Sequence, residues 1–245
     1  MNTQIELKKI LFLDIETVPE YESFDMLSPL MQDLFESKTR FQRKEQDSVA
    51  EFYSERAGVL SEFAKVVCIS AGFLSEDSNG EMLFRVKSFF SHDEKELLED
   101  FKTLLEANFS SFDNYLCAHN GKEFDYPFIA RRMIINSITL PASLDIAGKK
   151  PWEVKHLDTM ELWKFGDYKH YTSIKLLTAV LDIPSPKDDI DGSEVASVYY
   201  NEKDLKRIAI YCEKDTFTVA QIYLRLKGYN ILKQDRMLSL SQFDK

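Results

Sequence analysis

Hydrophobic residues in the first half of the chain fall into short continuous runs that are separated by polar segments. Such runs are typical of strands buried on both faces of a sheet, because successive side chains of a strand point to opposite sides. The Asn-Gly pair at residues 79 and 80 lies between two of these runs and predicts a hairpin. The predicted strands cover residues 8–14, 66–74, 82–90, 115–118 and 154–157.

Polar caps and helically spaced apolar positions predict helices between and after these runs. Ser91 followed by Glu94 matches a capping box, and the helix that it opens extends to about residue 108. Residues 124–135 have helical spacing, as does most of the chain from residue 172 onward.

This order of elements indicates an α/β fold with a mixed five-stranded central sheet flanked by helices. We expect one domain over residues 1–245, since this length can bury a single large core. A helical insertion is expected at about 21–63, and a weakly structured tail after about 228.

The charge balance narrows the classes of partner. A net charge of −10 argues against a broad basic surface that coats nucleic acid, but it allows a small site where metal ions join acids to a phosphate backbone. Basic residues do gather at Lys38, Arg40, Arg43 and Lys44, which are either a solvated face or a guide for a nucleic-acid strand.

The cysteines and the absence of targeting patterns indicate the compartment. Cys68, Cys117 and Cys212 occupy apolar contexts without paired spacing, which is typical of buried thiols in a reducing compartment and does not predict a zinc site. The N-terminus lacks a signal-peptide pattern, and no apolar stretch approaches the ~20 residues that span a bilayer. We therefore expect a cytoplasmic protein without a membrane partner.

Two acids stand at the end of the first predicted strand, in the sequence Asp14-Ile15-Glu16-Thr17. Residues i and i+2 of a strand share a face, so Asp14 and Glu16 should project together. Like charges this close raise the pKa of one group unless a cation lies between them. Mg²⁺ and Mn²⁺ prefer carboxylate oxygens, so this pair predicts a metal site. The alternative is a strand end that enters a polar loop.

Two further motifs place acids near the ends of predicted elements. Asn120 and Asp125 follow the strand at 115–118, where open α/β sheets bind ligands, although an acid is also a common choice for a first helical turn. Tyr211 and Asp215 are four residues apart and share one face of a long amphipathic helix. Taken alone, that pair is also compatible with a hydrogen bond that serves packing.

Together, the three motifs resemble those of the DEDD (DnaQ-like) superfamily of 3′-5′ exonucleases, which have a ribonuclease H-like fold. In chain order, the matching residues are Asp14 and Glu16, then Asn120 and Asp125, then Tyr211 and Asp215. The Tyr-x3-Asp form of the last motif is that of the DEDDy branch, because the histidine of the other branch would stand at Ile210. Over nearly its whole length, the chain is similar to the stand-alone PolB-like form of the exonuclease domain of family B DNA polymerases.

The resemblance implies metal-dependent hydrolysis at the 3′ end of DNA, expected to be single-stranded, with release of nucleoside 5′-monophosphates. It assigns two divalent cations, Mg²⁺ or Mn²⁺, to four carboxylates: Asp14, Glu16 and Asp215 would hold the first ion, and Asp14 with Asp125 the second. Two ions about 3.5–4 Å apart can stabilise both the attacking and the leaving oxygen. Tyr211 would orient the attacking water.

The resemblance also implies substrate contacts at Thr17, Asn120 and Phe124. The backbone near Thr17 and the Glu16 side chain would meet the terminal 3′-hydroxyl. Asn120 and Phe124 would contact the last nucleotides, Phe124 by stacking, which is worth about 1–3 kcal/mol for any base. For Phe124, a place in the helix core is the alternative.

Other functions stay open at this point. The substrate could be RNA, since contacts to the 2′-hydroxyl cannot be read from the sequence. The chain could be a catalytically silent nucleic-acid-binding module, although all four carboxylates and the tyrosine are present. A phosphatase of the HAD type also begins with an apolar strand and Asp-x-Asp, but Glu16 departs from that pattern. A polymerase or repair protein acting in trans is a candidate partner.

Overall fold

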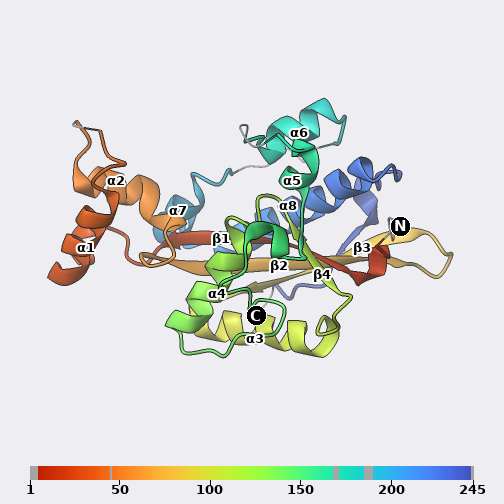
Figure 1. Cartoon of the computed structure of the whole chain (residues 1–245), viewed down its shortest axis with the longest axis horizontal. Coiled ribbons are helices and arrows are strands. Elements are labelled where there is room, and N and C mark those ends of the chain that lie inside the picture. Colours follow the sequence, from red (N-terminus) through yellow and green to blue (C-terminus); the bar gives the residue numbers. More distant parts are fainter. Residues whose placement is uncertain (1–4, 45, 168–170, 185–189, 244–245) are drawn as a thin grey trace.

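The computed structural model describes residues 5–44, 46–167, 171–184 and 190–243 (Figure 1). Within these ranges one sheet has the strand order β5-β4-β1-β2-β3-β6. The strands are β1 (Ile10–Pro19), β2 (Ala64–Glu76), β3 (Met82–Phe90), β4 (Tyr115–Ala118), β5 (Leu157–Asp158) and β6 (Met237–Ser239). β2 is antiparallel to β1 and β3, whereas β4 is parallel to both β1 and β5, and β6 is parallel to β3. The expected α/β fold with a mixed sheet is confirmed, and β6 adds a strand to the five expected.

Helices cover both faces of this sheet (Figure 1). One face carries α3 (Glu94–Asn108) and α4 (Asp125–Ile135), and the other carries α8 (Leu205–Leu226). The shorter α5 (Thr159–Lys164) and α6 (Ile174–Val180) pack on α8, and α7 (Val195–Ser197) continues into a π-helical turn at Val198–Glu202 before α8 begins. Of the helices described, none is long and apolar enough to cross a membrane.

Side chains of β1 alternate between the two hydrophobic cores. Leu11, Leu13 and Ile15 pack with α3 and α4, whereas Ile10 and Phe12 pack with α8. This alternation follows from the two-residue period of a strand. Because both faces of β1 are buried, its sequence is a continuous apolar run. The row that faces α8 continues into Asp14 and Glu16, so both acids leave the apolar core on the α8 side of the sheet.

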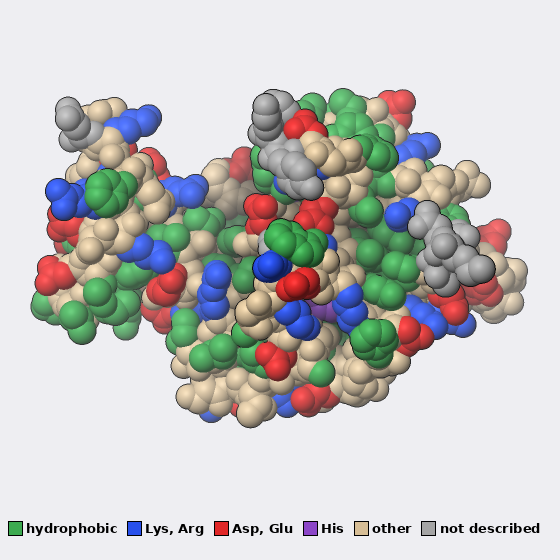
Figure 2. Space-filling model, in the orientation of Figure 1, with side chains coloured by type: hydrophobic (Ala, Val, Ile, Leu, Met, Phe, Trp, Pro, Cys, Tyr) green, Lys and Arg blue, Asp and Glu red, His purple; other side chains and the backbone are tan. Residues whose placement is uncertain are grey.

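The segment between β1 and β2 forms a helical lobe beyond the end of the sheet (Figure 1). It contains α1 (Pro29–Thr39), α2 (Val49–Arg56) and two short 3-10 turns, Phe24–Met26 and Ala57–Val59. Its aromatic core is built around the fully buried Phe35, whose ring centroid lies 5.1 Å from that of Tyr53. In the space-filling view, an open notch separates this lobe from the body of the protein (Figure 2).

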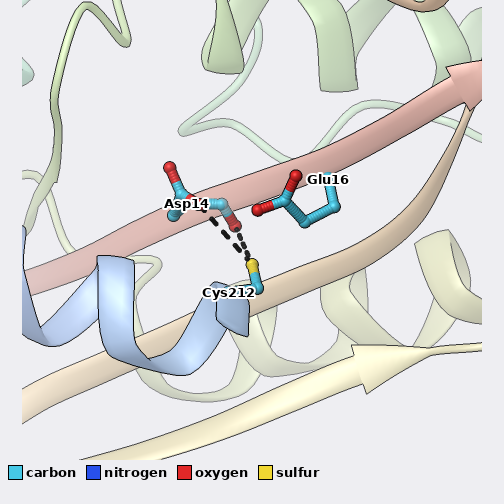
Figure 3. A group of neighbouring side chains, drawn as sticks. All are labelled: Asp14, Glu16 and Cys212. Atoms are coloured by element: carbon cyan, nitrogen blue, oxygen red, sulfur yellow. Dashed lines mark hydrogen bonds between the residues drawn. The ribbon is translucent and has the colours of Figure 1, made fainter. Parts of the chain in front are cut away.

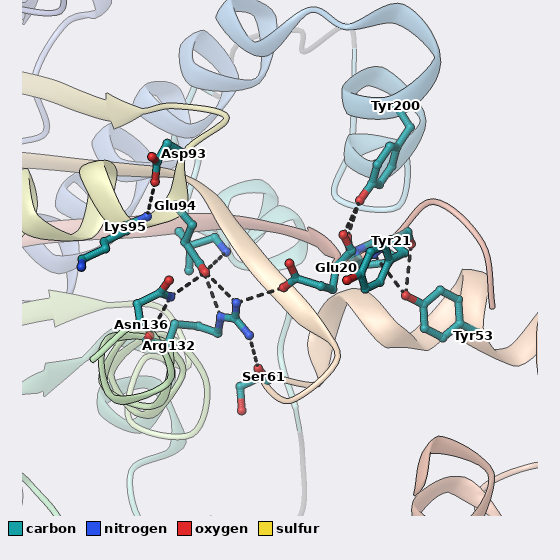
Figure 4. A network of polar contacts seen from close by, with 12 residues as sticks. Glu20, Tyr21, Tyr53, Ser61, Asp93, Glu94, Lys95, Arg132, Asn136 and Tyr200 are labelled. Atoms are coloured by element: carbon teal, nitrogen blue, oxygen red, sulfur yellow. Dashed lines mark hydrogen bonds and ion pairs between the residues drawn. The ribbon is translucent and has the colours of Figure 1, made fainter. Parts of the chain in front are cut away.

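A buried ion-pair network joins the lobe to the sheet and to α4 (Figure 4). Arg132 on α4 donates from Nε and Nη2 to the two carboxylate oxygens of Glu94, at 2.8 and 2.6 Å. Its guanidinium also reaches the Ser61 carbonyl and the Glu20 carboxylate, each at 3.0 Å. Glu94 in turn accepts the backbone N–H of Val66 at 2.7 Å. Arg132 thereby links α4 to α3 and to the segments just after β1 and just before β2, and Glu94 extends the network to β2 itself.

Some boundaries differ from the sequence-based expectation, each for a tertiary reason. β1 extends through Pro19 because its second half pairs with the start of β2. The fifth strand lies at Leu157–Asp158, where it pairs with the end of β4, and so starts later than the expected 154–157. The segment after residue 228 contributes β6, which Glu213 of α8 holds through hydrogen bonds from Ser239 and Ser241.

Candidate active site

β1 presents the first two candidate ligands side by side. Asp14 and Glu16 point to the same face, toward α8, while Ile15 between them enters the opposite core (Figure 3). A β-bulge follows directly, because Glu16 pairs with Cys68 but Thr17 pairs with Val66. Bulges re-aim side chains next to functional sites. Here the Thr17 hydroxyl donates to the Gly58 carbonyl at 2.6 Å, so Thr17 anchors β1 to the helical lobe.

α8 brings three more polar groups to this face. The Cys212 thiol donates to the Asp14 carbonyl, with sulfur and oxygen 3.4 Å apart, and its sulfur lies 3.7 Å from Asp14 Oδ2 (Figure 3). The Tyr211 side chain interacts with Asp215, one turn further along the helix. The charge of Asp215 acts on both Asp14 and Glu16. The Thr216 hydroxyl, 3.3 Å from the Ser70 carbonyl, fixes this part of α8 against β2.

α4 supplies Asp125 in its first turn. The residue is 3 % exposed, and its carboxylate interacts with the backbone of Ile15, directly between the two acids of β1. Gly121 makes this approach possible, since a Cβ there would lie 2.5 Å from the Ala118 Cβ. The chain can therefore turn from β4 into α4 tightly enough to place Asp125 beside β1.

Burial raises the pKa of Asp14, Glu16 and Asp125, and repulsion from the neighbouring acids adds to the shifts of Asp14 and Glu16. Burial, then the charges of Asp215 and Asp125, raises the pKa of Asp14 well above its ordinary value. Burial, then the charges of Asp14 and Asp215, does the same for the pKa of Glu16. Burial raises the pKa of Asp125 to about 8. Within the described ranges, no Lys or Arg forms an ion pair with Asp14, Glu16 or Asp125.

The donor set fits hard divalent cations. Carboxylates held together in a partly dry site need either protons or cations, and oxygen ligands are those that Mg²⁺ and Mn²⁺ prefer. The structure thus brings Asp14, Glu16, Asp125, Tyr211 and Asp215 to one place from three separate segments of the chain.

The remaining candidates lie in the loop between β4 and α4. The backbone of Asn120 is in the left-handed region, with φ of 63°, and its side-chain Oδ1 is buried without a hydrogen-bond partner in the described part of the chain. Such an orphaned acceptor fits a ligand that brings its own donor. Phe124 is half-buried, and its ring centroid lies 5.2 Å from that of Phe128, so it packs at the rim of the core.

Two residues near the site received no functional role from the sequence. Asp158 caps α5 and also accepts the backbone N–H groups of Asn120 and Lys122, at 3.0 and 3.1 Å. Cys212 was interpreted as a buried thiol, and nothing in its spacing predicts contact with Asp14. Asp158 and Glu161 have the spacing of a helix cap in the sequence. Nothing in the sequence indicates that Asp158 also holds the loop at Asn120.

Comparison with known proteins gives one match at the level of family. Residues 59–238 match the family model of a predicted 3′-5′ exonuclease related to the exonuclease domain of PolB. The match covers Asn120, Asp125, Tyr211 and Asp215 and begins after β1. No curated protein matches the chain.

Among solved structures, the chain is similar to the family B DNA polymerase from the hyperthermophilic archaeon Pyrobaculum calidifontis. The two share 13% sequence identity with a TM-score of 0.45, over 89% of this chain and 25% of that chain. The chain thus spans about a quarter of the polymerase to which it is similar.

Proposed function

The chain belongs to the family of predicted 3′-5′ exonucleases related to the exonuclease domain of PolB, and from this we propose that it removes nucleotides from the 3′ end of DNA in a reaction that needs two divalent cations. The observation that carries the proposal is the meeting of Asp14, Glu16 and Asp125, three buried or half-buried acids that no described Lys or Arg neutralises. Such a site has little value for stability, because buried unpaired charges are costly.

The family resemblance divides the ligands between two ions. Asp14, Glu16 and Asp215 would hold one, and Asp14 with Asp125 the other. Such ions stabilise the attacking and the leaving oxygens of an in-line displacement at phosphorus. The protein's own contribution is to hold the carboxylates close enough to share the ions. The two-residue period of β1 places Asp14 and Glu16 on one face, and the tight turn at Gly121 brings Asp125 beside β1.

Tyr211 positions water and does not act as a base. Burial, followed by the charge of Asp215, raises the pKa of Tyr211 far above its ordinary value, so its hydroxyl stays protonated at neutral pH. A protonated hydroxyl that interacts with Asp215 can hold an attacking water by hydrogen bonding. Asn120 Oδ1, which has no other described partner, would accept a hydrogen bond from the terminal nucleotide. Phe124 at the rim would stack on a base.

The kinship with a DNA polymerase domain favours DNA over RNA as the substrate. The test is a degradation ladder: purified protein with Mg²⁺ or Mn²⁺, single-stranded DNA labelled at the 5′ end, and an RNA of the same sequence. We expect metal-dependent shortening from the 3′ end, one nucleotide at a time, faster for DNA. Faster shortening of RNA would make the protein an RNA exonuclease, and no shortening of either would favour the silent binding module.

Two variants control the assay. Asp215→Asn removes a ligand and should abolish the ladder, whereas Glu99→Gln on the exposed side of α3 removes an acid far from β1 and should not. Circular dichroism of both variants separates loss of a ligand from loss of the fold. Normal turnover in a folded Asp215→Asn protein would contradict the metal assignment.

A further inference from the structure

A soft ligand lies among the hard ligands of the candidate metal centre. A carboxylate oxygen each from Asp14 and Glu16 and the sulfur of Cys212 all lie within 4.8 Å of one another (Figure 3). Mg²⁺ prefers sites made of oxygen alone, whereas thiolate ligands select ions such as Zn²⁺. The three side chains therefore form a donor set that differs in kind from an all-oxygen magnesium site.

The surroundings of the Glu16 carboxylate also indicate that this cluster takes an ion. Its side chain points to the place where the Asp14 carboxylate and the Cys212 sulfur meet (Figure 3). The residue is only 7 % exposed, and among the described residues its carboxylate has neither a hydrogen-bond donor nor a Lys or Arg partner. Because an unpaired buried carboxylate is costly, a cation beside it would supply the missing partner.

A second thiol stands behind the first. Cys68 on β2 lies opposite Glu16 in the sheet, and its side chain belongs to the same buried cluster as that of Cys212. Both sulfurs are fully buried, so water does not compete for them. The site thus offers one sulfur donor, that of Cys212, next to two carboxylates, although these residues are far apart in sequence and show no zinc-site spacing.

We propose that Asp14, Glu16 and Cys212 bind a thiophilic divalent cation such as Zn²⁺, and that this ion holds the nuclease inactive. The metal–sulfur bond forms as the thiol proton leaves to solvent. Ligands of tetrahedral zinc lie about 2.0–2.3 Å from the ion and hence about 3.3–3.8 Å from one another, so rotation of the two carboxylates closes the site. The inhibitory part rests on the proposed function, since the ion would occupy two carboxylates that the exonuclease needs for Mg²⁺.

Cadmium is the probe for the site itself, because a sulfur-to-cadmium charge-transfer band in the ultraviolet reports thiolate ligation without any activity. The full chain, kept reduced with a phosphine, is titrated with Cd²⁺ in the absence and presence of Zn²⁺. We expect a band that saturates at one ion per chain, that Zn²⁺ displaces, and that Cys212→Ser and Cys212→Ala both lose. Absence of the band, or its persistence in both variants, would overturn the proposal.

Cys117→Ser is the matched control. Cys117 is also a fully buried thiol, but it lies on β4 in the core between the sheet and α8, away from Glu16. The cadmium band should therefore survive this substitution, and its loss would point to a general effect of removing a buried cysteine. Thermal melts of all variants show whether each is folded before it is titrated.

The inhibitory part is tested by zinc titration of nuclease activity at fixed Mg²⁺, with each protein normalised to its own zinc-free rate. We expect the zinc concentration for half-inhibition to be at least tenfold higher in Cys212→Ser than in the unmodified chain. Equal inhibition of the two would overturn it. If the unmodified chain degrades nothing in Mg²⁺ alone, the proposed function fails, while the cadmium band still decides whether the site exists.

Discussion

The carboxylate of Asp158 accepts the backbone N–H of Asn120 at 3.0 Å, and with its other oxygen that of Lys122 at 3.1 Å. The same side chain caps α5 by accepting from Met160 at 2.9 Å. One acid on the edge strand β5 therefore holds the loop that leads from β4 to Asp125. It also holds the left-handed backbone of Asn120, a conformation that carries some strain.

Replacing Asp158 with Asn should loosen this loop. The side-chain amide nitrogen of this variant would face a backbone N–H group, so at least one hydrogen bond to a charged acceptor is lost. We expect the free energy of unfolding to fall by about 1.5–3 kcal/mol. We expect a higher KM for the 3′ end of DNA as Asn120 loses its position. Steady-state kinetics and denaturant unfolding measure the two effects.

Asp93→Asn is the matched control for this change. Asp93 caps α3 by accepting from Lys95 at 2.9 Å and Glu96 at 3.3 Å, but it holds no loop of the candidate site. Its substitution should lower stability without changing KM. If both variants changed KM alike, Asp158 would have no positioning role.

Tyr211→Phe should lower kcat about 10²-fold, the scale of a misplaced reacting group. The ring stays, the hydroxyl that interacts with Asp215 is lost, and the carboxylates that bind metal remain, so the dependence on Mg²⁺ concentration should not move. Single-turnover rates measure the effect on chemistry. Tyr223→Phe, elsewhere on α8 and packed against Phe12, is the control expected to retain full activity. An unchanged rate in Tyr211→Phe would remove the residue from the mechanism.

The metal-free protein should become less stable as the pH rises. Asp125 binds its proton more tightly in the folded state, because its pKa is raised from 3.8 to about 8 by burial. The protonated Asp125 contributes its full stabilisation below about pH 4, and this contribution is lost between about pH 4 and 8. While only the folded state stays protonated, the free energy of unfolding falls by about 1.4 kcal/mol per pH unit. The raised pKa values of Asp14 and Glu16 act in the same direction.

Melting temperatures in chelator and in Mg²⁺ test this dependence. Ligands must lose their protons before an ion binds, so the stabilisation by Mg²⁺ should grow with pH. Asp125→Asn should flatten the pH dependence in chelator and raise the stability there near pH 8. A metal-free melting temperature that does not change from pH 5 to pH 8 would argue against strained carboxylates.

Arg132→Gln should destabilise the fold by about 3–5 kcal/mol, because Glu94 would remain buried without its cation (Figure 4). The double variant Arg132→Gln/Glu94→Gln should lose less than the sum of the two single changes, since it leaves no uncompensated charge. Urea unfolding of the four proteins completes the cycle. Strict additivity would show that the pair acts as two independent groups.

The local features of this fold were determined by the sequence alone. The buried strands follow from apolar runs, the hairpin from Asn79-Gly80, and the shared direction of Asp14 and Glu16 from the two-residue period of a strand. These features depend on neighbours within a few residues, so sequence reasoning can reach them. Through its resemblance to a family, the sequence also indicated that the distant motifs belong together.

Tertiary structure alone decided the contacts between segments far apart in the chain. The bulge that turns Thr17 toward Gly58 depends on pairing with β2, the place of Asp125 depends on how closely Gly121 lets two elements approach, and the loop of Asn120 depends on Asp158. The meeting of Cys212 with Asp14 depends on how α8 rotates onto the sheet. Such contacts are set by packing and register, which no single segment encodes.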